Sequence, residues 1–125
     1  MPTILLVDDS TTEVHVFSKM LKKHGYDVCV ANDGETAVAM AQELQPALIL
    51  MDIVMPGMDG FKATRILSRA PETKAIPIII ISTKAQETDK IWGIRQGARD
   101  YLIKPVTENT LIAKIKSILA EGERG

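Results

Sequence analysis

The sequence predicts one doubly wound α/β domain over residues 1–125, a five-stranded parallel sheet with helices on both faces. Three observations predict this fold class. Five apolar runs alternate with five segments in which apolar residues recur every three or four positions, as in βαβ units. The runs lack polar alternation, which is typical of parallel strands buried on both faces. Acidic, hydroxyl or amine side chains end several runs, at the sheet edge where α/β folds bind ligands.

The apolar character of each predicted strand indicates its place in the sheet. The runs at 47–51 and 76–81 are the most apolar and should be interior, whereas 27–31 and 101–103 are more polar or shorter and should form edges. With the first strand at 3–7, the expected order is 2-1-3-4-5. The direction of winding then reverses between the first and third strands, which opens a crevice at their carboxyl ends.

Local capping and stop signals mark the ends of the first three helices. Ser10 followed by Glu13 predicts a capping box at the start of the first helix, which Gly25 ends. The second helix ends before Pro46, and the third is expected from Phe61 to about Arg69.

The last two helices carry similar signals. Thr83 with Gln86 predicts another capping box, opening a fourth helix whose apolar stripe includes Ile91 and Ile94. Trp92 lies beside that stripe. Thr107 caps the fifth helix, and the tail 121–125 is expected to fray because it has little to bury.

Composition and charge restrict the class of protein. The formal net charge of −1 gives no electrostatic reason to expect binding to nucleic acid or to an anionic membrane. Cys29 is the only cysteine, which excludes an internal disulfide and favours a reducing compartment. The sequence shows no signal peptide and no apolar run long enough to span a bilayer. We therefore expect a cytoplasmic protein that neither binds nucleic acid nor inserts into a membrane.

Three carboxylates are expected to meet at the crevice. Asp8 and Asp9 end the first strand, and Asp52 ends the third. Carboxylates brought within a few ångströms repel one another unless they are protonated or bridged by a cation, and an oxygen-only site open to water suits Mg²⁺. Adjacent strand residues point to opposite faces, so one of the first pair should bind the metal directly and the other through water. We expect Asp9 to be the direct ligand.

The crevice also contains the groups that phosphoryl transfer requires. With Mg²⁺ bound, the Asp52 carboxylate can attack phosphorus as a covalent nucleophile. Lys104 and Ser82 each come at the end of a strand of the same sheet, so we expect both at this crevice. There Lys104 supplies positive charge and Ser82 supplies a hydroxyl for the phosphoryl oxygens.

These residues together resemble the response-regulator receiver domains of the CheY-like superfamily. The resemblance rests on Asp8-Asp9, on Asp52 with the loop 55–60, on Ser82, and on Lys104-Pro105 preceded by Tyr101. It covers the whole chain. The stretches 91–98 and 100–105 also resemble the stand-alone regulators of type IV pilus twitching motility.

The resemblance implies a role for each of these residues. Asp52 would accept a phosphoryl group from a histidine kinase or a histidine phosphotransfer domain. The metal ligands would be Asp9, Asp52 and the main-chain carbonyl of Val54, with Asp8 acting through water. Ser82 and Lys104 would bind the phosphoryl oxygens.

The resemblance also implies how the signal leaves the domain. Ser82 and Tyr101 would form the switch, with Tyr101 turning inward on activation. A partner would read the face formed by the fourth helix, fifth strand and fifth helix, in two-component signalling such as chemotaxis or pilus motility. The residues at Val54 and Lys84 would influence the phosphoryl lifetime. The protein would be a signalling module and not an enzyme.

Two alternatives remain open from the sequence. A haloacid-dehalogenase-like phosphatase also uses Asp, Ser or Thr, Lys and Mg²⁺, but that family requires Asp-x-Asp after the first strand, whereas here Asp8 and Asp9 are adjacent. The second alternative is a constitutive scaffold whose acidic site is vestigial. Turnover of a small phosphate ester would support the phosphatase, and failure to take up phosphoryl under any condition would support the scaffold.

Overall fold

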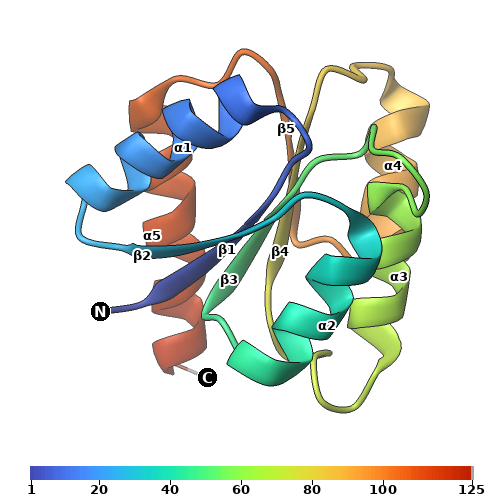
Figure 1. Cartoon of the computed structure of the whole chain (residues 1–125), viewed down its shortest axis with the longest axis horizontal. Helices are drawn as coiled ribbons and strands as arrows, with labels where there is room; N and C mark the ends of the chain where they lie inside the picture. Colours follow the sequence, from blue (N-terminus) through green and yellow to red (C-terminus); the bar gives the residue numbers. More distant parts are fainter. Residues whose placement is uncertain (125) are drawn as a thin grey trace.

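The computed structural model describes residues 1–124 and confirms the predicted fold class, a parallel sheet with five alternating helices (Figure 1). The strand order β2-β1-β3-β4-β5 is the predicted one, and every neighbouring pair is parallel. The elements are β1 (Thr3–Val7), α1 (Thr11–Lys23), β2 (Asp27–Ala31), α2 (Gly34–Leu44), β3 (Leu48–Met51), α3 (Gly60–Arg69), β4 (Ile78–Ser82), α4 (Glu87–Gln96), β5 (Asp100–Ile103) and α5 (Glu108–Arg124).

Helices cover both faces of the sheet and divide its core into two layers. In Figure 1, α1 and α5 lie on one side of the sheet, while α2, α3 and α4 lie on the other. Successive strand residues point to opposite faces, so Ile4 and Leu6 pack towards α1 and α5, whereas Leu5 and Val7 pack towards the other layer. This explains why the strands are apolar throughout.

The start of α1 differs from the predicted capping box in one of its two hydrogen bonds. Ser10 does cap the helix, because its Oγ accepts a hydrogen bond from the Glu13 backbone N–H at 3.3 Å. The Glu13 carboxylate, however, does not return to the Ser10 backbone. The Ser10 N–H donates instead to Asp8 Oδ1 at 2.8 Å, which leaves the Glu13 side chain free to contact Lys104.

The predicted start of the fourth helix is wrong by three residues. The helix begins at Glu87 with Gln86 as its N-cap, and the Gln86 N–H donates to the Asp89 carboxylate at 3.2 Å. Thr83 lies in the preceding loop. In that loop both main-chain groups of Lys84 are bonded: its N–H donates to Ser82 Oγ, and its carbonyl accepts from the Tyr101 hydroxyl.

The predicted buried stripe of α4 is also wrong. Ile91 and Ile94 are 47% and 48% exposed, and Trp92, which was expected beside the stripe, is 49% exposed. The residue of α4 that is buried is Gly93, where an added Cβ would lie 2.9 Å from Ile80 Cδ1. The helix therefore packs on the sheet by close backbone approach and presents its large apolar side chains outward.

The fifth helix begins at the predicted cap and continues into the tail. Thr107 caps α5 as predicted, since its Oγ1 accepts the Thr110 N–H at 3.2 Å. The helix extends to Arg124, and the fraying expected for 121–125 stays a prediction. Gly125 lies outside the described residues.

Candidate metal centre

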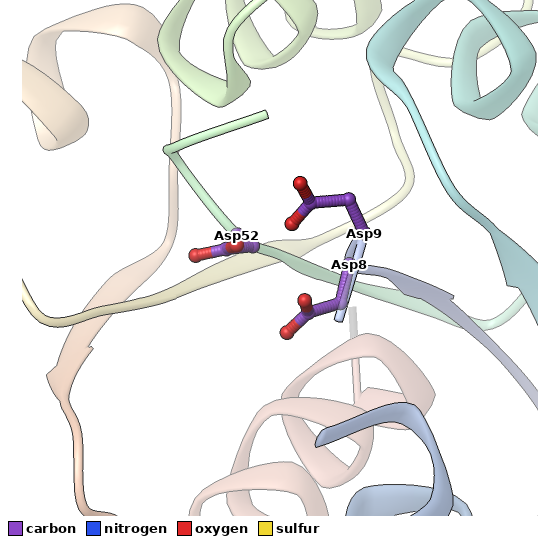
Figure 2. Close-up of side chains that lie close together, drawn as sticks. All are labelled: Asp8, Asp9 and Asp52. Carbon is purple, nitrogen blue, oxygen red and sulfur yellow. The ribbon is translucent and has the colours of Figure 1, made fainter. Parts of the chain in front are cut away.

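Asp8, Asp9 and Asp52 meet at the carboxyl ends of β1 and β3. Val7 pairs with Met51 in the sheet, and the Asp52 N–H continues the ladder by donating to Val7 O at 2.9 Å. One ligand oxygen from each carboxylate lies within 4.8 Å of the others. Figure 2 shows all three carboxyl groups directed to the same side of the two strand ends. The expected acidic cluster is therefore confirmed.

The cluster has the chemistry of a magnesium site. Its donors are all carboxylate oxygens, which hard divalent cations prefer. Asp8 and Asp52 are buried, whereas Asp9 is exposed and leaves the site open to the water molecules that Mg²⁺ retains. The residues therefore fit the Mg²⁺ ion that the sequence predicts. The direct role of Asp9, the water-mediated role of Asp8 and the carbonyl role of Val54 stay predictions.

Close packing at Gly60 fixes the end of β3. A Cβ at Gly60 would lie 2.0 Å from the carbonyl oxygen of Asp52, so a side chain there would push α3 away from the strand. The Gly60 N–H donates to Ile53 O at 2.9 Å. The loop after Asp52 is thus held against the start of α3.

Lys104 brings a cation into the same pocket. It follows β5, and its backbone N–H donates to Ser82 O at 2.9 Å, which fixes the strand end beside β4. Its Nζ lies 3.3 Å from Asp8 Oδ2 and 3.5 Å from Asp52 Oδ1. Lys104 therefore lies beside the acidic cluster, as the sequence predicts.

Burial and charge act against each other in this pocket. Burial raises the pKa of Asp52 to about 6, although the Lys104 ammonium favours the ionised form. Burial alone would lower the pKa of Lys104, but the surrounding carboxylates outweigh it and hold that pKa above its usual value. Burial likewise raises the pKa of Asp8. The site is therefore strained by negative charge that one lysine only partly neutralises.

Ser82 and Tyr101 are linked through the main chain of Lys84. Ser82 is fully buried at the end of β4, and its Oγ accepts the Lys84 N–H at 3.1 Å. The Tyr101 hydroxyl donates to Lys84 O at 2.7 Å, with its ring already buried. The inward position expected for activation is therefore the one this structure describes, and the switching role of the two residues stays a prediction.

Glu13 is a member of the pocket that the sequence analysis missed. Its carboxylate accepts a hydrogen bond from Lys104 Nζ. Burial alone would raise the pKa of Glu13, but hydrogen bonding to Lys104 and Asp8 together with the Lys104 charge outweighs it and holds that pKa below the ordinary value. Its position three residues after Ser10 indicated a capping box, and no local signal indicated a partner 91 residues away.

Comparisons with known proteins agree with this site. Residues 4–116 match the family model of the response regulator receiver domain. Protein PilH of Pseudomonas aeruginosa is 57% identical over 120 residues, which cover 96% of this chain and 99% of PilH. The chemotaxis protein CheY4 of Vibrio cholerae has a solved structure with a TM-score of 0.87 at 32% identity, covering 94% of this chain and 98% of CheY4. A putative response regulator from Chloroflexus aurantiacus gives a TM-score of 0.91 at 34% identity, covering 95% and 98% of the two chains.

The family match excludes one of the two alternatives left open above. A receiver domain is a signalling module that pairs with histidine kinases, so the phosphatase interpretation is wrong. Among residues 1–124, no helix has the length and apolar character needed to cross a membrane. The chain belongs to the response regulator receiver domain family, as a single-domain regulator like PilH.

Proposed function

We propose that Asp52 is the phosphoryl acceptor of this regulator. The observation that carries the proposal is the meeting of Asp8, Asp9 and Asp52 beside Lys104 at the carboxyl edge of the sheet. An Asp52 carboxylate oxygen attacks the phosphorus of a phosphohistidine on a histidine kinase or phosphotransfer domain. The P–O bond forms as the P–N bond breaks, and the histidine nitrogen leaves with the electron pair.

The surrounding residues are assigned to the metal and to the phosphoryl oxygens. Asp9, Asp52 and the Val54 carbonyl would hold Mg²⁺, with Asp8 acting through water. The bound metal would supply positive charge that neutralises the transferred group. Lys104 and the Ser82 hydroxyl bind the remaining phosphoryl oxygens.

The proposed output surface is the face formed by α4, β5 and α5. Three features support it: the exposed apolar side chains of α4, the burial of Tyr101 on β5, and the bond from Tyr101 to Lys84 in the loop that follows Ser82. A phosphoryl group that draws the Ser82 hydroxyl changes the bond between Ser82 and Lys84. A protein partner that binds this face then distinguishes the two states.

The pathway is proposed from the relatives and from the sequence. Similarity to PilH, together with the stretches 91–98 and 100–105, supports a role in pilus-driven twitching motility rather than in chemotaxis. The proposal includes a cytoplasmic location, residues 1–125 acting as one domain, and no binding to nucleic acid. Val54 and Lys84 are proposed to set the phosphoryl lifetime.

Phosphoryl uptake from acetyl phosphate with Mg²⁺, measured by intact mass, tests the acceptor. The wild type should gain one phosphoryl group and Asp52→Asn none. The control Asp27→Asn, at the exposed start of β2, should behave as the wild type. Stable phosphorylation of wild type at another residue would refute the assignment. No uptake by the wild type under any condition would favour the constitutive scaffold.

A further inference from the structure

Lys104 is shared among three carboxylates, and one of them comes from outside the metal cluster. Its Nζ hydrogen-bonds to Asp8 at 3.3 Å and to Glu13, and it pairs with Asp52 at 3.5 Å. An ammonium group has three hydrogens to donate. All of these partners are carboxylates, and a phosphoryl group arriving on Asp52 competes with them for the same ammonium group.

Glu13 is held near the pocket by the way α1 begins. It is the third residue of that helix, where a carboxylate commonly turns back to the capping residue. Here the Ser10 N–H is already bonded to Asp8, so the Glu13 side chain extends towards Lys104 instead. The pairing follows from the local geometry of the loop after β1.

The two partners differ in their access to water. The Glu13 side chain is 36% exposed, whereas that of Lys104 is 11% exposed. Both line a groove of about 280 Å³ between α1 and the segment that follows β5. Glu13 can therefore regain hydration when the pair separates, while Lys104 has to keep an anionic partner inside the pocket.

We propose that Glu13 is a positioning residue that competes with the phosphoryl group for Lys104. In the unphosphorylated protein it holds the ammonium group towards α1. When Asp52 is phosphorylated, the phosphoryl oxygens replace the Glu13 carboxylate, and Glu13 turns into the groove. Asp8 and Asp52 do not fill this role, because both belong to the metal cluster. The inference rests on the function proposed for Asp52 and adds a resting partner for Lys104.

The variant Glu13→Gln tests the competition, because it removes the charge and keeps the shape. Glu43→Gln is the matched control, since Glu43 is an exposed acid on α2. With Mg²⁺ present, beryllofluoride serves as the phosphoryl mimic, and its dissociation constant is measured by titration. Glu13→Gln should bind beryllofluoride about fivefold more tightly than wild type. At 1.4 kcal/mol per tenfold change, this corresponds to about 1 kcal/mol. That value is at the upper end of the range for a partly exposed ion pair. The control should be unchanged. Glu13→Asp, which keeps the charge on a shorter stem, should fall between wild type and Glu13→Gln.

A second measurement tests the pair without any phosphoryl chemistry. The ¹⁵N resonance of the Lys104 side chain is recorded in metal-free buffer for wild type and the three variants. Glu13→Gln should shift the Lys104 signal, and Glu43→Gln should leave it in place. An unshifted signal shows that the pair does not form in solution and overturns the proposal.

The two measurements separate failure of this inference from failure of the proposed function. If the Lys104 signal shifts but Glu13→Gln binds beryllofluoride equally or more weakly, Glu13 does not compete and the inference is wrong. If the wild type neither binds beryllofluoride nor takes up a phosphoryl group, the function proposed for Asp52 is wrong. The proposed competition between Glu13 and the phosphoryl group is then wrong as well.

Discussion

Replacing Asp52 by asparagine should stabilise the metal-free protein at neutral pH. Asp52 is 9% exposed, and its burial raises the pKa to about 6 from an ordinary value of 3.8. The ionised carboxylate is therefore less favourable in the folded protein than in the unfolded chain. Asparagine has nearly the same shape and carries no charge, so it removes this cost.

The size and the pH dependence of the effect follow from the two pKa values. At 1.36 kcal/mol per pH unit, the difference between 3.8 and about 6 corresponds to about 3 kcal/mol. Between about pH 4 and pH 6, the folded protein keeps a proton on Asp52 that the unfolded chain has released. The free energy of unfolding of the wild type therefore falls as the pH rises through this window, and the full cost persists above it. The gain should be about 2–3 kcal/mol, because the pKa of about 6 already includes the attraction of Lys104, and the buried asparagine amide still needs hydrogen-bond partners.

Urea unfolding in the presence of a chelator measures this gain. The free energy of unfolding is compared for wild type, Asp52→Asn and the surface control Asp27→Asn at pH 4 and pH 7.5. The stabilisation by Asp52→Asn, relative to the control, should be small at pH 4 and about 2–3 kcal/mol at pH 7.5. Adding Mg²⁺ should stabilise the wild type more than the variant and narrow the difference, because a ligand that binds the folded state raises its stability.

Two results would contradict this reasoning. If the gain is equal at pH 4 and pH 7.5, it does not arise from ionisation of Asp52. If no gain is seen at pH 7.5, then Lys104 compensates the buried charge fully, and the pocket is not under electrostatic strain.

Three further changes test other parts of the structure. Asp9→Asn should lower Mg²⁺ affinity, because it removes one carboxylate from the acidic cluster; unchanged affinity by calorimetry would exclude Asp9 as a ligand. Beryllofluoride should change the fluorescence of Trp92 and the amide shifts of residues 83–105, and a silent Trp92 with shifts confined to the acid pocket would move the output surface elsewhere. Gly93→Ala should cost about 1 kcal/mol in urea unfolding, because overpacking against Ile80 outweighs the helix propensity gained. The open helical position Gly122→Ala should gain stability instead, and equal gains at both positions would contradict the packing of α4.

The sheet and the acidic cluster could be predicted from sequence because each depends on burial along the chain. Parallel strands covered on both faces need continuous apolar runs, so 47–51 and 76–81 were recognisable as interior. Edge strands tolerate polar residues, and the two more polar or shorter runs therefore favoured the order 2-1-3-4-5. Asp8 and Asp52 were then brought together by strand order alone, because the carboxyl ends of neighbouring parallel strands lie side by side.

The errors arose where one residue could satisfy two local patterns. Glu13 fits a capping box after Ser10, and only the position of Lys104, fixed by the far end of the sheet, decides that it forms an ion pair instead. On α4, Ile91 and Ile94 have the spacing of a buried stripe. The side that packs on the sheet is instead the one with Gly93, because a residue without a side chain lets the helix approach the Tyr101 ring. Neither outcome has a local signature.

The weak attachment of α4 explains how a small change at the pocket could reach the surface. α3 buries Ala63, Thr64 and Leu67 in addition to its first glycine, whereas α4 buries Gly93. A helix that buries little apolar side-chain area can shift at low cost in free energy. The loop before α4 is joined to the pocket by the Lys84 main chain, which bonds to the Ser82 hydroxyl on one side and to the Tyr101 hydroxyl on the other. Through these bonds, the proposed new acceptor for the Ser82 hydroxyl would act on the loop that leads into α4.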